Sequence, residues 1–322
     1  MTTTMTAGVR LSALPPAAGR AGLKGALASE FTKLRSVRST YWTLAALLIV
    51  SIGIGAAICA GQAANFNQNP GNLAGFDGTQ TSLAAFFEIG QLIIAVLGAM
   101  VITSEYSTGM IRTSLTAQPR RGVVYAAKAI VFTGVTLVIS VITSFIAFFL
   151  GQALLGHGVA ASLFHTVKIH TGVEGCINKG GPGPGPGGGG GPGCPPGSMK
   201  FIGTTVITPG TVLAAIIGTA LFVTIVALIA YGVGSILRHT AGAIATVIAL
   251  MFIIPILENA LPSEWHNDIM RWLPDAANQV VSVTNGQVVQ NLWSAWPQLG
   301  VTALWAAALV GIGAYLFRKR DA

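Results

Sequence analysis

Long apolar runs, each about twenty residues or more in length and almost free of charge, alternate along the chain with shorter polar segments. A run of this length is enough to cross a hydrocarbon layer about 30 Å thick as a helix. The pattern predicts six membrane-spanning helices, with approximate ranges Tyr41–Ala60, Leu83–Thr103, Val123–Leu154, Val212–Leu237, Ala241–Leu261 and Leu299–Phe317. The third run is long enough to be strongly tilted or to extend beyond the bilayer.

The composition agrees with a membrane protein. Of the 322 residues, 52% are hydrophobic and only 9% are charged, whereas about 25% of the residues in a soluble domain are charged. A soluble fold of this length has no core large enough for so many apolar side chains. We therefore predict an all-α integral membrane protein with six transmembrane helices, an N-terminal interfacial amphipathic helix and a short cytoplasmic coupling helix between spans two and three.

The segments around the spans complete this organisation. Residues 1–22 are predicted to be a disordered N-terminus, residues 41–154 to contain spans one to three, and residues 211–322 to contain spans four to six. Residues 23–40 are predicted to form the interfacial helix because their apolar residues share one helical face, although a soluble linker helix is the alternative. Glu30 and Arg38 interrupt that face, so we expect one or both to have a protein partner.

The distribution of basic residues predicts the orientation. Short loops rich in Lys and Arg remain in the cytoplasm during insertion. In the six-span arrangement, 14 of the 18 basic residues fall on one side of the membrane, which places both termini in the cytoplasm. The net charge of +8 then reflects topology and contact with anionic lipid, and not nucleic-acid binding.

The largest segment outside the spans is the extracytoplasmic loop at residues 155–210. Its stretch from Gly180 to Gly197 is nearly all Gly and Pro, a composition typical of a flexible loop without a core. Cys176 and Cys194 lie at this loop, and an external compartment permits a disulfide between them. Two unpaired surface thiols are an equally good interpretation, because spacing alone does not establish pairing.

Span two contains the acid that most needs an explanation. Glu88 lies about five residues inside the predicted span, where a charged side chain should face protein or water and not lipid. Glu88, Gln91 and Gly98 share one small and polar helical stripe. They are candidates for a translocation path or, alternatively, for a helix interface.

Motifs for catalysis and cofactor binding are absent from the sequence. It has no Gly-x-x-x-x-Gly-Lys-Ser/Thr phosphate loop, no His-Glu-x-x-His zinc motif and no Gly-x-Ser-x-Gly elbow. We therefore expect no catalytic, cofactor-binding or metal-binding residues on this chain, and no hydrolysis of ATP by it.

The segment between spans two and three faces the cytoplasm by the charge distribution. Gly109 permits a turn before a short amphipathic stretch, and Pro119 ends it. Such a helix, attached to two spans, can transmit force from a docked cytoplasmic protein. An ordinary connection anchored by arginines is the alternative.

Three motifs together resemble the permease subunits of type 2 ABC exporters, particularly those of actinobacteria. They are the Glu-Tyr-x-x-Gly-x-Ile-Arg-x-x-Leu run from Glu105 to Leu115 with the later Pro119, Arg120, Arg121 and Lys128, the run from Glu30 to Ser39, and the run from Arg238 to Gly242. With the spans, the resemblance covers roughly residues 25–160 and 205–320, but not the Gly/Pro-rich insertion.

The resemblance implies a plasma-membrane exporter subunit in a bacterium, working as a homodimer or heterodimer. ATP would be bound and hydrolysed by a separate cytoplasmic ABC ATPase. The residues expected to couple the permease to that ATPase are Glu105, Tyr106, Gly109, Met110, Ile111, Arg112 and Leu115. The alternative function is an ion-coupled or passive carrier without a nucleotide-binding partner, for which inverted repeats and buried ion-binding acids are typical.

Overall fold

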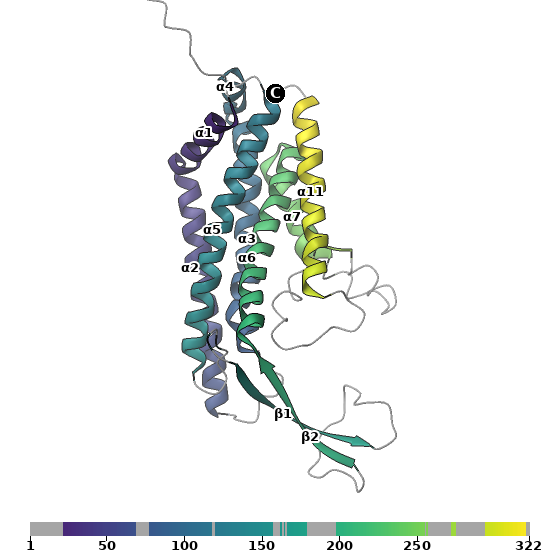
Figure 1. Ribbon diagram of the computed structural model, residues 1–322. Coiled ribbons are helices and arrows are strands. Elements are labelled where there is room, and N and C mark those ends of the chain that lie inside the picture. The colour runs from purple at the N-terminus through teal and green to yellow at the C-terminus, as the bar shows by residue number, and fades with distance from the viewer. Residues whose placement is uncertain are drawn as a thin grey trace, which may run out of the picture.

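The computed structural model describes residues 22–68, 77–117, 120–156, 162, 164, 166–178, 198–254, 256, 272–274 and 294–319. Its described residues form an elongated bundle of helices with a two-stranded hairpin projecting from one end (Figure 1). The elements are α1 (Leu23–Ser36), α2 (Arg38–Gln68), α3 (Gly78–Ser107), α4 (Met110–Ala117), α5 (Arg121–Leu155), β1 (Val167–Asn178), β2 (Ser198–Ile207), α6 (Pro209–Leu237), α7 (Thr240–Ile248), the π-helix η2 (Ala249–Ile253) and α11 (Ala295–Lys319).

Five of the six predicted spans correspond to long helices. Among the described residues, α2, α3, α5, α6 and α11 are each long and apolar enough to cross a membrane. The fifth predicted span, Ala241–Leu261, is represented by α7 and η2, which cover only Thr240–Ile253 as a shorter apolar helix. The remainder of that span lies almost entirely outside the described residues, so a sixth crossing stays a prediction.

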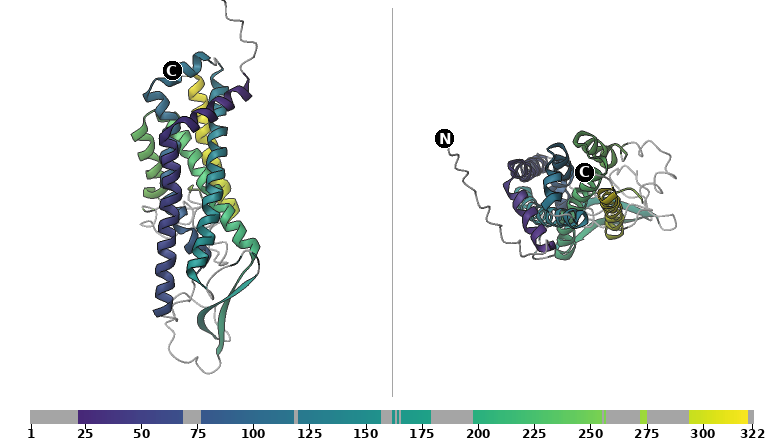
Figure 2. Two further views of the ribbon diagram at one scale, coloured as in Figure 1. Left: turned by 90° about the vertical axis from the view of Figure 1, so that its left-hand side faces the viewer. Right: turned by 90° about the horizontal axis from the view of Figure 1, so that it is seen from above.

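The helix α5 is longer than a membrane requires. Its 35 residues correspond to roughly 52 Å at 1.5 Å per residue, against a hydrocarbon layer of about 30 Å. The prediction that this span extends beyond the bilayer is consistent with that length. The extra turns place the first part of α5 beside α1 and α4 (Figures 1 and 2).

The centre of the bundle is formed by α3 and α6. In the most apolar part of each helix, 67% of α6 and 61% of α3 is buried, against 22% for α2 and 28% for α5 and α11. Glycines let these two helices approach closely. A Cβ added at Gly98 would lie 2.5 Å from the Ala227 carbonyl oxygen, and one added at Gly234 would lie 3.0 Å from that of Ala99. Small residues at helix contacts are typical of packing inside membranes, where burial from water supplies no driving force.

Local signals in the sequence account for several helix ends. Asp77 caps α3 by accepting hydrogen bonds from the amides of Thr79 and Gln80. Thr208 caps α6 in a reciprocal capping box, with Pro209 at the first turn. Between α1 and α2, Val37 adopts an extended conformation, so the chain bends there and the two helices have different directions (Figure 1).

The predicted outer loop contains regular structure that we did not expect. β1 and β2 pair antiparallel, with a register irregularity between His170 and Glu174. The all-α prediction is therefore correct for the bundle and incomplete for this segment. Alternating and β-branched residues at the start of β1 favour a strand, a signal that the neighbouring Gly and Pro obscured. The tract from 180 to 197 itself lies outside the described residues, as does the predicted disordered N-terminus up to residue 21.

Candidate functional site

Two short helices lie together at one end of the bundle, the end at which α11 also finishes (Figure 1). One is α1, which precedes the first long helix, and the other is α4, which connects α3 to α5. Between α3 and α4, Gly109 has φ +70°, in the left-handed region that a side chain disfavours. This glycine lets the chain turn sharply from a long helix into a short one, as the sequence predicted.

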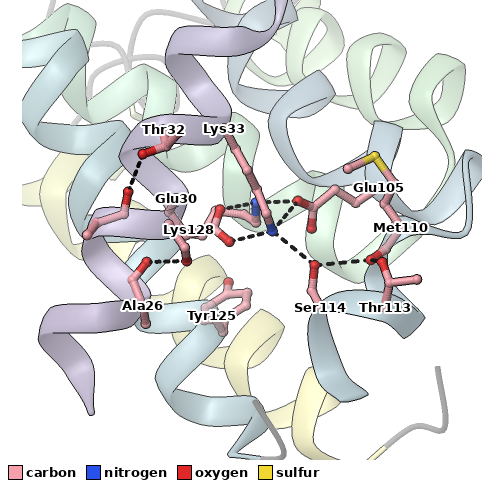
Figure 3. Close-up of polar contacts among 12 residues, drawn as sticks. Ala26, Glu30, Thr32, Lys33, Glu105, Met110, Thr113, Ser114, Tyr125 and Lys128 are labelled. Atoms are coloured by element: carbon pink, nitrogen blue, oxygen red, sulfur yellow. Dashed lines mark hydrogen bonds and ion pairs between the residues drawn. The ribbon is translucent and has the colours of Figure 1, made fainter. Parts of the chain in front are cut away.

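A cluster of four charged side chains joins these helices, and we refer to Glu30, Lys33, Glu105 and Lys128 as the ion network (Figure 3). Lys33 Nζ donates to Glu30 Oε1 at 2.8 Å and to Glu105 Oε1 at 3.4 Å. Lys128 Nζ donates to Glu105 Oε1 at 2.8 Å and to Glu30 Oε2. The two cations and two anions balance, and they connect α1, α3 and α5.

The network also reaches the predicted coupling helix. Lys33 Nζ donates a third hydrogen bond, 2.9 Å long, to Ser114 Oγ on α4. A single ammonium group on α1 thus contacts both the last turns of α3 and the helix that follows it. Because Lys33 links α1 to α4 through this hydrogen bond, a displacement of α4 would act directly on the network.

Burial makes these charges costly to separate. Glu30 is 3% exposed, Glu105 7% and Lys128 6%, whereas the side chain of Lys33 is 30% exposed. Removing one partner from a buried ion pair leaves an uncompensated charge, which typically costs about 3–5 kcal/mol. The network therefore holds α1 against α3 and α5 as long as all four charges are present.

The protonation states support the same conclusion. Burial raises the pKa of the Glu30 carboxyl group, but the charge of Lys128 and the hydrogen bonds from Lys128 and Lys33 outweigh this effect, so its pKa is below the ordinary value. Burial lowers the pKa of Lys33, but its hydrogen bond to Glu30 and the charge of Glu105 outweigh that effect and raise it. Both groups are charged at neutral pH.

The turn between α6 and α7 contacts the same end of α3. The Arg238 guanidinium lies over the Tyr106 ring, 4.8 Å from its centroid, and Thr240 Oγ1 donates to Thr103 Oγ1 at 2.9 Å. Arg238 itself has φ 57°, which ends α6. The three sequence motifs that carry the resemblance are far apart in the sequence but meet at one end of the molecule.

The predicted coupling residues do not all face outward. Met110 is 48% exposed and can contact a partner protein. Ile111 is only 4% exposed and packs into the core, so it cannot. Glu105 belongs to the ion network and Tyr106 contacts Arg238. The side chains of Arg112 and Leu115 lie outside the described residues.

The stripe predicted in the second span divides into two environments. Gly98 packs directly on α6, and Gln91 is 5% exposed, which supports the helix-interface interpretation for both. Glu88 is instead exposed on the surface of the single chain. A role of these residues in a translocation path stays a prediction.

The remaining candidate groups are cysteines. Cys176 lies on β1 opposite Lys200 of β2, but its side chain and all of Cys194 are outside the described residues, so their disulfide stays a prediction. Cys59 is buried and free. In the part of the chain that the structure describes, no group of three or more His, Cys, Asp or Glu residues is arranged to bind a metal ion.

The ion network contains residues that sequence reasoning did not name as a site. Each of two network residues is a charge in an apolar stretch of the sequence. Lys128 lies inside a predicted span, and Glu30 lies on the apolar face of the predicted interfacial helix. The expectation that Glu30 has a protein partner is confirmed by its contacts with Lys33 and Lys128. A buried cation and a buried anion on separate apolar helices are the signal that could have paired them.

A comparison with family models bears on this arrangement. Residues 26–176 match the ABC-2 family transporter protein. The matched region runs from α1 into β1 and includes all four residues of the ion network. No curated protein matches the chain in a separate comparison. The ABC-2 match and the five long apolar helices together support a membrane transport component, the permease of an ABC transporter.

Proposed function

We propose that this chain is the transmembrane subunit of an ABC exporter, which forms the translocation path and is driven by a separate cytoplasmic ATPase. The observation that carries the proposal is the position of α4. It is a short helix at the end of the bundle, it lies within the ABC-2 match, and the ion network links it to α1, α3 and α5.

In this mechanism the ATPase docks on α4 and moves it. The movement would act on Lys33 through Ser114, and Lys33 in turn contacts Glu30 and Glu105. Glu105 lies in the last turn of α3, and α3 packs against α6. A movement of the network would therefore displace the two helices at the centre of the bundle. The permease would work as a homodimer or heterodimer in the bacterial plasma membrane, with ATP bound only by the partner ATPase.

The orientation is part of the proposal. The end with α1, α4 and the C-terminal end of α11 would face the cytoplasm, and the β-hairpin would face outward. Cysteines introduced one at a time at Arg120 and Ser162, in a chain without its own cysteines, test it in intact cells. We expect an impermeant thiol reagent to label position 162 and not position 120. Labelling at position 120 would overturn the orientation.

The docking role is tested with charge and surface changes on α4. We expect Arg112→Glu and Leu115→Asp to lower both the yield of the permease–ATPase complex and its ATP turnover, while the permease still inserts, because these positions are outside the long apolar helices. Lys319→Glu is the matched control, since Lys319 is an exposed charge at the same end of the bundle on α11. Co-purification with a candidate ABC ATPase, co-expressed with the permease, gives the readout.

The result also separates the two functions predicted from sequence. If both α4 variants keep full complex yield and turnover, α4 is not the docking element. If, in addition, no ATPase co-purifies with the parent protein, an ion-coupled or passive carrier becomes the better assignment.

A further inference from the structure

The β-hairpin is a part of the chain to which the proposed function gives no role. β1 follows α5, and β2 ends at Ile207, just before α6 begins at Pro209. Both α5 and α6 are long and apolar enough to cross a membrane, and the hairpin extends obliquely from the end of α6 (Figure 1). Its base therefore lies close to the surface of the bilayer, where these two helices leave the hydrocarbon layer.

The register of the strands assigns each residue to one of two faces. Successive residues of a strand lie on opposite faces of the ribbon. Across the irregularity between His170 and Glu174, β1 advances by four residues and β2 by two, so the faces are not exchanged there. Odd-numbered residues pair with odd-numbered residues on both sides of it. The odd-numbered positions of both strands therefore share one face, and the even-numbered positions share the other.

The two faces differ in composition. The odd-numbered face, which we call the apolar face, contains only apolar residues, threonine and glycine. Its paired apolar residues are Val167, Ile169, Ile177, Met199, Phe201 and Ile207. The even-numbered face contains every charged residue of the two strands, namely Lys168, Glu174 and Lys200. A two-stranded hairpin alone is marginally stable in water, so a surface must cover the apolar face.

The base of the hairpin shows which way the apolar face turns. Ile207 is 1% exposed and packs in the hydrophobic core of the bundle, and Thr208 caps α6 directly after it. Farther out, no described helix packs along either strand. The apolar face is thus continuous with the membrane-embedded core at one end. Phe164, between α5 and β1, is 85% exposed, and contact with lipid is more favourable than contact with water for so large an apolar side chain.

We propose that the hairpin lies on the surface of the bilayer beside the bundle, with its apolar face in contact with lipid and its even-numbered face in contact with water. Burial of apolar area at the head-group boundary drives such binding, as it does for amphipathic helices. Lipid surrounds the bundle at the level where the apolar face leaves the core, so this face can pass from protein to lipid without contacting water. The proposal needs a membrane-embedded bundle, but neither a docked ATPase nor a particular orientation.

Site-directed spin labelling of the full-length protein in dioleoylphosphatidylcholine vesicles tests the proposal. Single cysteines are introduced on β2, in a chain whose own cysteines are replaced by alanine. Collisions of each label are measured with oxygen, which concentrates in lipid, and with a water-soluble nickel chelate present on both sides of the vesicle. We expect an oxygen-to-nickel collision ratio several-fold higher for Met199→Cys, Phe201→Cys and Thr205→Cys than for Lys200→Cys, Ile202→Cys and Thr204→Cys. Labels at Ile49, which is 71% exposed on α2, and at Thr116, which is exposed on α4, give the lipid and water references.

The collision pattern identifies what covers the apolar face. High nickel accessibility at odd and even positions alike would mean that water covers it. Low accessibility to both reagents at the odd positions, with spin–spin broadening that disappears on dilution with unlabelled protein, would mean that a second copy covers it. Either result would overturn the proposal. If a label at position 199 or 205 prevents folding, Ile177→Cys or Ile169→Cys reports on the same face from β1, because these residues pair with those positions.

A second measurement keeps the native cysteines. Phe201→Trp and Lys200→Trp each add one tryptophan, on the apolar face and on the even-numbered face respectively. In vesicles of brominated phosphatidylcholine, we expect the added emission to be quenched for Phe201→Trp and retained for Lys200→Trp, and equal quenching would overturn the proposal. Both measurements use the permease alone, whereas ATPase docking is measured by complex yield, so failure of one proposal is distinguishable from failure of the other.

Discussion

The two ends of the helix bundle are both held by polar side chains, but of different kinds. At one end is the ion network, with four charges on three helices and a link to α4. At the opposite end is what we call the neutral cluster, formed by Gly78, Ser82 and Gln152, where Gln152 Nε2 donates to the Gly78 carbonyl and to Ser82 Oγ, each at 2.9 Å. The neutral cluster joins α3 and α5, and Cys59 of α2 donates to its Ser82 Oγ at 3.9 Å.

The two ends differ in the length of their polar side chains and in how closely the helices pack around them. Long Lys and Glu side chains can change partners while staying paired, and they connect two short helices to two long ones. In the neutral cluster the helices α3 and α5 are in close contact instead. A Cβ added at Gly151 of α5 would lie 2.4 Å from Ser82 Oγ of α3. The ionic end is thus suited to an element that moves relative to the bundle, and the neutral end to a fixed contact.

The largest expected effect comes from removing one charge of the network. Lys128→Met should destabilise the protein by about 3–5 kcal/mol, because Glu30 and Glu105 would remain buried without this cation. The apparent Tm in detergent, at one fixed scan rate, measures the loss. Adding Glu30→Gln to Lys128→Met should recover part of it, since one uncompensated charge is then removed. No recovery would show that the two side chains are not coupled.

A pair of glycines tests how tightly each end is packed. Gly151→Ala should cost about 1–3 kcal/mol, because its Cβ would collide with buried Ser82. At the ionic end, the three atoms nearest to a Cβ at Gly122 all belong to the Arg318 guanidinium group, the first at 2.8 Å. That exposed side chain can move aside, so Gly122→Ala should stay within about 0.5 kcal/mol of the parent. Similar losses in thermal unfolding for both variants would contradict the proposed difference.

The hydrogen bonds of the neutral cluster should contribute less than the charges. Gln152→Leu preserves the size of the side chain and removes two interhelical hydrogen bonds. We expect a loss of about 0.6–1.7 kcal/mol, the range of side-chain hydrogen bonds between membrane helices. A loss as large as that of Lys128→Met, measured by the same thermal scan, would mean that charge is not what distinguishes the two ends.

The smallest effect is a dependence on pH that only the ionic end should show. Folding lowers the pKa of Glu30 below its ordinary 4.5. Its contribution to stability is therefore complete above that pH and is lost as the pH falls through the lower, folded-state value. The Tm difference between the parent and Glu30→Gln should shrink below pH 4.5, whereas the difference between the parent and Gln152→Leu should not change. A constant difference for Glu30→Gln would show that Glu30 does not titrate with folding.

The places where sequence analysis succeeded share a physical basis. Long apolar runs are decided locally, because any segment in a bilayer must satisfy its own backbone hydrogen bonds, and a helix does so within itself. Five predicted spans are therefore helices, and four of them end within about five residues of the predicted positions, whereas α2 continues past Ala60. Gly109 and the helix after it were also predictable, since a positive φ between two helical patterns favours glycine.

The hairpin was not predictable to the same degree. Strand pairing brings Val167 beside Ile207, forty residues away, and nothing in either segment alone specifies that partner. The described part of the fifth predicted span is an α-helix followed by a π-helix, and the crossing itself stays a prediction.

The sequence by itself determined that this chain is a membrane protein, where its long helices lie, and that Glu30 or Arg38, or both, needed a protein partner. The tertiary structure alone decided that Glu30 pairs with Lys33 and Lys128. Glu30 and Lys128 are 98 residues apart, and their pairing requires α1 to bend away from α2 and to pack against α5. Burial adds the final condition, because a charge removed from water is stable only beside an opposite charge that the fold brings within reach.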